Sequence, residues 1–307
     1  MLGVLVGFAI VAAVIATGWI LGRTRLLGDG ASMTLNRLAF FVLSPAILFT
    51  VLARADIHAL LSTQLPVAAI ASVTTIAAFL LVSLLAWRRR IPEAVIGALG
   101  AGYQNANNIG LPVSLYILGE AAASAPVILL QLVVLAPIAL AILDMTTSGH
   151  ASIGRVLLQP VRNPMVIGSV LGFICALTGW LPPEPVMDFF ELLGGAAVPV
   201  LLINFGLSLA GSRILAPGPD RKDIVLASVL KLVAMPAIAW AVARFVFGLD
   251  GHALFVAVAL AALPAANNVF NFAQRYDRGV TIGRDTVLIT TVGSFPVLLV
   301  VAALLAA

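Results

Sequence analysis

Six of the nine asparagines in the chain fall in two short stretches of otherwise apolar sequence. The first stretch covers residues 100–112 and the second covers residues 263–272. An amide side chain offers two N–H donors and a carbonyl acceptor without a net charge. Such groups can hold a polar ligand and release it again, so we expect a reversible binding site made by Asn105, Asn107, Asn108, Asn267, Asn268 and Asn271.

Helix-breaking residues accompany both stretches, namely Gly110 and Pro112 in the first and Pro264 in the second. Asn competes for backbone hydrogen bonds, Gly adds backbone freedom and Pro removes a donor, so each segment is expected to break near its middle. In a membrane, such breaks are tolerated only inside the protein or beside a watery cavity. The second half-helix then presents free amides and a partial positive charge to the cavity, which favours an anion.

A different interpretation of these amides is structural. Asn and small residues often hold membrane helices together by hydrogen bonds and close packing. For any single asparagine the two roles stay open. Broken segments at matching positions in the two halves of a chain favour a transport site.

Four other residues are candidates for the same region. Tyr103 lies beside the first break and could stack on a planar part of a ligand, while Ser44 and Asn204 either face the cavity or form packing hydrogen bonds. Lys231 is a charged residue in an apolar segment, which makes it a candidate for ion coupling. Its flexible stem could instead carry the ammonium group to the membrane interface.

The sequence predicts no metal site, no cofactor and no enzyme. Cys175 is the only cysteine, and neither a His-Glu-x-x-His helix nor a glycine-rich phosphate loop occurs. No pair of acidic residues falls at a predicted helix centre, which weakens proton or sodium coupling. Backbone carbonyls at a broken helix can also bind sodium, so the coupling ion stays open.

The composition requires a lipid environment, because 62% of the 307 residues are hydrophobic and only 10% are charged. A spanning helix needs roughly 20 mostly apolar residues. Ten such segments can be recognised, at about 2–21, 37–53, 64–87, 94–118, 124–145, 164–180, 186–210, 224–247, 253–273 and 286–306.

The net charge of +4 does not indicate nucleic-acid binding, because the basic residues do not form one patch. They lie in every second loop between the predicted helices. These loops contain Arg23, Arg25, Arg88, Arg89, Arg90, Arg155, Arg213, Arg221, Lys222, Arg275, Arg278 and Arg284, and Arg37 and Arg162 lie at the adjoining helix ends. Short loops rich in Lys and Arg stay in the cytoplasm. We therefore expect a multi-pass protein of the bacterial inner membrane with both termini outside.

The two halves of the chain resemble each other at a nearly constant offset in sequence. Gly18-Trp19 recurs as Gly179-Trp180, Pro45 as Pro199, and Asn107-Asn108 as Asn267-Asn268. We expect one five-helix repeat in residues 1–150 and a second in 151–307. An odd number of helices in each repeat makes the second inverted.

These motifs resemble the auxin efflux carrier family, in its compact bacterial form. The matching residues are Asn36-Arg37-Leu38, Leu43 to Phe49, Asn107 to Pro112, Lys231-Leu232 with Pro236, Leu263 to Ala266, Phe270 and Tyr276. The resemblance implies an all-α fold of two inverted five-helix repeats, in which broken helices four and nine cross. It also implies scaffold helices at about 1–53 and 160–210, transport helices at about 64–146 and 222–306, an elevator movement, and a homodimer through the scaffold.

The expected function is secondary or facilitative transport of a small organic anion, such as a mono- or dicarboxylate, by efflux or exchange. One alternative is a sodium-coupled symporter similar to the bile-acid transporter group, which shares the broken helices. Another is a membrane sensor that binds the anion without transporting it.

Overall fold

The structure, a computed structural model, describes residues 2–28, 30–55, 63–148, 163–210 and 220–305. The predicted boundary between the repeats at 150 and 151, together with Arg155, Arg162 and Arg213, lies outside these residues. All regular elements in the described ranges are helical, and no strand occurs there. Two extended residues, Gln104 and Ala265, form an isolated antiparallel bridge.

Six helices in the described part of the chain are long and apolar enough to cross a membrane, at Ala31–Ala53, Leu65–Ala86, Ala125–Thr147, Glu184–Leu207, Arg221–Val246 and Val280–Leu305. Shorter apolar helices lie at Ala9–Thr24, Ile91–Gly102, Pro164–Thr178 and Gly251–Ala261. All of them fall within or overlap the ten segments expected from the sequence. Ten complete crossings remain a prediction.

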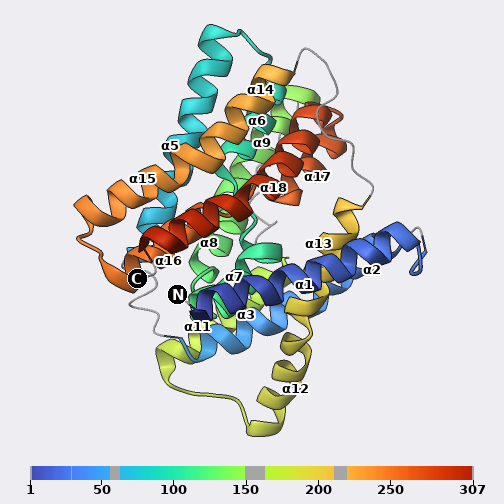
Figure 1. The fold of residues 1–307 in the computed structure, drawn as a ribbon, viewed down its shortest axis with the longest axis vertical. Coiled ribbons are helices and arrows are strands. Elements are labelled where there is room, and N and C mark those ends of the chain that lie inside the picture. The colour runs from blue at the N-terminus through green and yellow to red at the C-terminus, as the bar shows by residue number, and fades with distance from the viewer. Residues whose placement is uncertain (1, 29, 56–62, 149–162, 211–219, 306–307) are drawn as a thin grey trace.

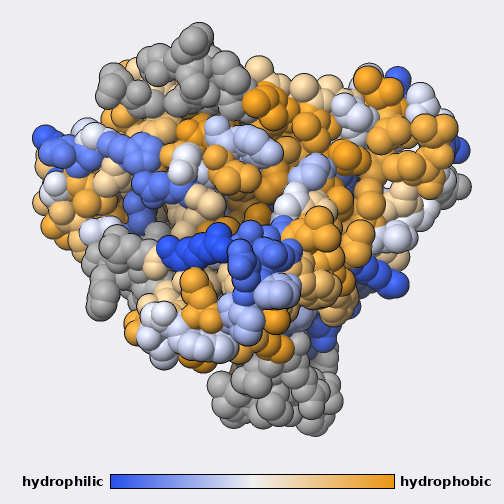
Figure 2. Space-filling view, turned by 90° about the horizontal axis from the view of Figure 1, so that it is seen from below, coloured by the Kyte–Doolittle hydropathy of each residue, from blue (hydrophilic) through white to orange (hydrophobic). Residues whose placement is uncertain are grey.

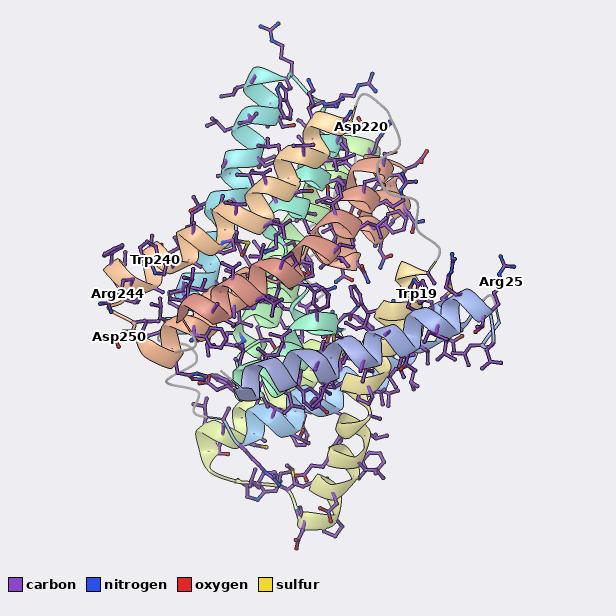
Figure 3. The ribbon with its side chains drawn as sticks, viewed as in Figure 1. Trp19, Arg25, Asp220, Trp240, Arg244 and Asp250 are labelled. Carbon is purple, nitrogen blue, oxygen red and sulfur yellow. The ribbon has the colours of Figure 1, made fainter. Side chains whose placement is uncertain are left out.

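Many large apolar side chains are exposed, including Leu85, Leu192, Phe245 and Leu304. Hydrophobic residues cover much of the face shown in Figure 2. Charged residues mark helix ends: Asp220 precedes the long helix Arg221–Val246, and Arg244 in its last turn pairs at 3.2 Å with Asp250, which lies beyond it (Figure 3). This distribution is that of a multi-pass membrane protein, whose apolar surface is covered by lipid.

Several long helices widen into π-helical turns immediately before a proline. Segments η1 (Ala39–Leu43), η4 (Ala106–Gly110), η6 (Leu130–Leu135) and η7 (Leu230–Ala234) end two residues before Pro45, Pro112, Pro137 and Pro236. Proline lacks the N–H that would bond to the carbonyl four residues earlier, and its ring clashes with that carbonyl. The wider turn relieves the clash without ending the helix.

A first helix group lies in the lower half of Figure 1. It contains α1 (Leu2–Thr24), α2 (Ala31–Leu38), α3 (Ser44–Ala53), α11 (Pro164–Thr178), α12 (Glu184–Gly195) and α13 (Ala197–Leu209). Glycines allow close approach within it. A Cβ atom at Gly18 of α1 would lie 2.1 Å from the carbonyl oxygen of Ile203 in α13, and one at Gly168 of α11 would lie 2.5 Å from that of Pro45 in α3.

A second helix group lies above the first in Figure 1. It contains α5 (Leu65–Leu81), α6 (Ile91–Gly102), α9 (Ala136–Ser148), α14 (Arg221–Val229), α15 (Met235–Ala241), α16 (Gly251–Ala261), α17 (Asn267–Tyr276) and α18 (Val280–Leu305). The two groups meet at the short helical segments η4, α7 (Leu111–Val113) and η5 (Ser114–Leu118), which contact α1 and α13. A further short helix, α8 (Ala125–Leu129), contacts both α5 and α11.

Candidate functional site

The first helix break occupies residues Tyr103 to Asn105. Helix α6 ends at Gly102, Tyr103 is extended, and the helical path resumes at η4. The side-chain oxygen of Asn105 accepts a hydrogen bond from the backbone N–H of Asn108 at 3.1 Å. Asn105 therefore caps the new turn, which is a common role for Asn at a helix start.

The second break separates α16 from α17. Helix α16 ends at Ala261, and Ala266 is extended before α17 begins at Asn267. The backbone N–H of Ala265 donates to the hydroxyl oxygen of Thr290 in α18 at 3.0 Å. Because residues 261–266 are buried, the Ala265 N–H needs a hydrogen-bond partner, and Thr290 replaces the helical carbonyl that it would otherwise use.

The two breaks cross and bond to each other. Asn105 N–H donates to the Pro264 carbonyl at 2.7 Å, and Ala266 N–H donates to the Tyr103 carbonyl at 2.9 Å. The amide of Gln131 in η6 donates to the Gln104 carbonyl at 2.8 Å. These bonds replace the missing helical ones, so the irregular backbone can remain inside the protein.

A cavity of about 380 Å³ opens beside this crossing. Eight of the nine asparagines line it: Asn36, Asn105, Asn107, Asn108, Asn163, Asn267, Asn268 and Asn271. The other lining residues are Arg37, Phe40, Phe41, Tyr103, Gln104, Ala106, Ile128, Gln131, Leu132, Ala136, Leu140, Met165, Ala266 and Phe272. Amides therefore dominate the polar part of the wall, and aromatic and aliphatic side chains form the rest.

Some of these side-chain amides are hydrogen-bonded to one another, and others contain donor or acceptor atoms without a described partner. The side-chain N–H of Asn107 donates to the Asn108 side-chain oxygen at 2.9 Å. In contrast, the buried Nδ2 of Asn105, Oδ1 of Asn107 and Nε2 of Gln104 have no hydrogen-bond partner among the described residues. Buried polar atoms are normally hydrogen-bonded, so these atoms are available to a ligand.

The cavity is electropositive. Arg37 is the one charged residue among the described residues that line it, and it makes no ion pair with another described residue. The N-terminal end of α17 also lies at the wall, because Ala266, Asn267 and Asn268 line the cavity. A guanidinium group and a helix N-terminus both favour a negatively charged ligand.

The structure brings seven of the predicted site residues together at the cavity wall: Tyr103, Asn105, Asn107, Asn108, Asn267, Asn268 and Asn271. Gly110 and Pro112 lie just beyond the wall in η4 and α7, and Pro264 contributes its carbonyl to the crossing. Their roles in binding remain predictions.

Three predicted residues lie away from the wall. Ser44 is buried at the start of α3, and the side-chain oxygen of Asn204 accepts a hydrogen bond from Ser32 at 2.7 Å. Lys231 is also completely buried, so its ammonium group does not reach the membrane interface. Among the described residues, no group of three His, Cys, Asp or Glu side chains is arranged to hold a metal ion.

Sequence reasoning missed five polar lining residues: Asn36, Arg37, Gln104, Gln131 and Asn163. Asn36 and Arg37 belong to a family motif in the sequence, and Arg37 was interpreted only as a topological charge. Gln104 lies inside the first asparagine stretch and was overlooked beside its neighbours. Gln131 and Asn163 are isolated in sequence, so only the packing of η6 and α11 brings them to the cavity.

Comparisons with known proteins match nearly the whole chain. The family described as "Membrane transport protein" matches residues 4–302. A protein of Rhizobium meliloti (strain 1021), named "Putative malonate transporter", is 25% identical over 265 residues, which cover 84% of this chain and 82% of that protein. An "Uncharacterized transporter" of Methanothermobacter thermautotrophicus is 28% identical over 284 residues, 92% of each chain.

A plant relative matches a shorter region. The "Probable auxin efflux carrier component 5b" of Oryza sativa subsp. japonica is 33% identical over 148 residues. This match covers 47% of the present chain and 39% of the rice protein.

Proposed function

Because the chain belongs to the membrane transport protein family that includes the auxin efflux carriers, we propose that it transports a small organic anion of the mono- or dicarboxylate class. The transport is secondary or facilitative, by efflux or exchange. The observation that carries the proposal is the cavity at the crossing, where eight asparagines surround a volume of about 380 Å³ and Arg37 supplies the only charge among the described lining residues.

The lining suits a carboxylate that must bind and leave. One carboxylate can pair with the guanidinium group of Arg37, and amide N–H groups such as Asn105 Nδ2 can bind a second. Neutral amides bind an anion less tightly than a cluster of cations would, which permits release. The relative named for malonate supports a dicarboxylate as the first substrate to test.

Inverted repeats are part of the proposal, and repeated local structure supports them. Helix α6 starts at Ile91, and α16 starts at the equivalent position of the second half, Gly251. The π-helical segments η3 (Val82–Ala86) and η8 (Val242–Val246) are related by the same offset in sequence. Arg88 and Gly248, which share this offset, both adopt positive φ angles, of 51° and 64°.

We also propose an elevator movement, in which the second helix group carries the crossing of the two breaks past the first, which contributes Asn36, Arg37 and Asn163 to the cavity wall. The first group is joined tightly through glycines, as a fixed scaffold requires. Its contacts with the second group run mainly through the short segments η4, α7 and η5. Asn36, Arg37 and Asn163 at the cavity wall lie near the starts of helices that follow the basic loops in sequence, which supports a cavity open to the cytoplasm and termini outside the membrane.

Counterflow in proteoliposomes tests the function. Vesicles loaded with unlabelled malonate, malate or an aromatic acid should accumulate the corresponding labelled acid in a saturable manner. Asn107→Ala should lose this accumulation while retaining its melting temperature. Asn204→Ala is the matched variant, because it removes the one asparagine side chain outside the cavity and should retain flux. Absence of flux for every acid tested, or equal flux in Asn107→Ala, would contradict the proposal.

A further inference from the structure

Lys231 is buried without an acidic partner. Its exposure is 0%, and it lies in η7, which packs against α5, α6 and α18. Its Nζ atom contacts the carbonyl oxygen of Ala261 at 2.8 Å and the sulfur of Met235 at 3.0 Å. No described Asp or Glu forms an ion pair with it.

The contacted carbonyl is at a special position. Ala261 is the last residue of α16, at the second helix break. In a continuous helix its carbonyl would accept the N–H of Ala265, but that N–H donates to Thr290 instead. The C-terminal end of a helix carries partial negative charge, so the ammonium group sits on a carbonyl that attracts a cation.

Carriers with broken helices commonly use such carbonyl ends to bind a coupling sodium ion or proton. We propose that the ammonium group of Lys231 is a resident cation, which occupies this position in place of a coupling ion and makes the protein independent of sodium. Removing the side chain then opens a site for a monovalent cation, bounded by the Ala261 carbonyl and by the sulfur of Met235 one turn later. The consequence for transport rests on the proposed function, but cation binding itself does not.

Lys222 provides a matched control. It is the only other lysine in the chain, and its exposed ammonium lies 4.7 Å from the centre of the Trp87 ring. Lys222→Ala thus removes the same side chain and charge without opening a space at the helix break. Lys231→Met removes the charge while keeping most of the side-chain volume.

The test measures binding of ²²Na⁺ and melting temperature for the full-length protein in nanodiscs, in sodium, choline or ethylammonium chloride. Wild type and Lys222→Ala should bind no saturable ²²Na⁺ and melt at the same temperature in sodium and choline. Lys231→Ala should melt lower in choline, bind ²²Na⁺, and regain most of the lost melting temperature in ethylammonium, because a ligand of the folded state stabilises it. Lys231→Met should melt lower with no recovery, since its side chain fills the space.

Saturable ²²Na⁺ binding by wild type would overturn the inference, and this measurement decides even if the Lys231 variants do not fold. Equal responses of Lys231→Ala and Lys222→Ala to ethylammonium would also overturn it. Malonate counterflow of the wild type, repeated with choline in place of sodium, separates the two proposals. Absent flux with the expected cation results would reject the proposed function alone, whereas flux that requires sodium would reject the resident cation alone.

Discussion

The backbone N–H of Asn105 donates to the carbonyl oxygen of Pro264 at 2.7 Å, and a second bond returns from Ala266 to Tyr103 at 2.9 Å. Asn105 and Ala266 are separated in sequence by the same interval as Tyr103 and Pro264. The same sequence offset therefore relates the two donors to each other and the two acceptors to each other, so each bond is the counterpart of the other in the second half of the chain. A local two-fold relation of this kind is what inverted repeats require at their crossing, and it supports the proposed duplication.

Gln131 should hold the crossing in place. Its side-chain N–H donates to the Gln104 carbonyl at 2.8 Å within the buried bridge. Gln131→Leu would remove this bond and leave the Gln104 carbonyl with the Ala106 N–H, at 2.8 Å, as its donor among the described residues, a loss of about 0.5–1.5 kcal/mol. We expect a lower melting temperature and weaker malonate binding than in wild type. Gln64→Leu is a suitable control, because the contact of Gln64 with Ala253, at 3.5 Å, is long. An equal loss of stability in both variants would contradict this role.

Gly206 should be essential for the packing of α1 against α13. A Cβ atom at this position would lie 2.1 Å from the carbonyl oxygen of Ile15. The added methyl group would clash with backbone atoms of α1, which cannot rotate away as a side chain can. The helices must therefore separate, which lowers the free energy of unfolding by about 1–3 kcal/mol. Gly195→Ala, where the added methyl group meets no atom within 4 Å, is the control. Thermal unfolding monitored by tryptophan fluorescence should show a marked decrease only for Gly206→Ala.

Tyr276 should make the protein sensitive to alkaline pH. Its hydroxyl donates to Asp144 of α9 at 2.6 Å and joins α17 to α9, and Tyr276 itself lies beyond the predicted membrane segment 253–273. Burial, followed by this bond, raises the pKa of Tyr276 to about 12. The folded-state pKa exceeds the unfolded one, so the stabilisation is complete below about pH 10 and is lost as the pH rises towards about 12.

Melting temperatures measured across this interval check the effect of Tyr276. Wild type should lose more stability than Tyr276→Phe, which cannot ionise at this position. Parallel curves for the two proteins would show that the titration of Tyr276 does not contribute.

The breaks and their asparagines could be predicted from sequence because their causes are local. Asn, Gly and Pro disturb a helix wherever it lies, and Asn107-Asn108 and Asn267-Asn268 mark both breaks directly. Six of the seven predicted residues at the wall are asparagines that follow from this rule, and the seventh, Tyr103, lies beside the first break. Proline also explains the π-helical turns, although their width was not predicted.

The remaining site residues depend on packing between distant segments. Asn204 looked equivalent to the other intramembrane asparagines, yet α13 turns it towards Ser32. The sequence allowed Lys231 either to extend to the membrane interface or to be buried. In the structure it is buried, and its ammonium group binds the Ala261 carbonyl at the end of α16. Asn163 lies far beyond the first break in sequence and reaches the cavity only because α11 begins beside it.

Arg37 should determine the preference of the cavity for anions. As the one charge among the described lining residues, it can form a charge-assisted hydrogen bond with a carboxylate, a contribution of about 1.5–3 kcal/mol. Arg37→Met should therefore weaken malonate binding roughly 10- to 100-fold, and Arg37→Lys should recover part of the affinity. Arg90→Met removes an exposed arginine that lies outside the cavity and should leave affinity unchanged. Scintillation proximity binding measures all four proteins. A loss in Arg37→Met that is matched in Arg90→Met would mean that general surface charge, rather than contact with the anion, sets the affinity.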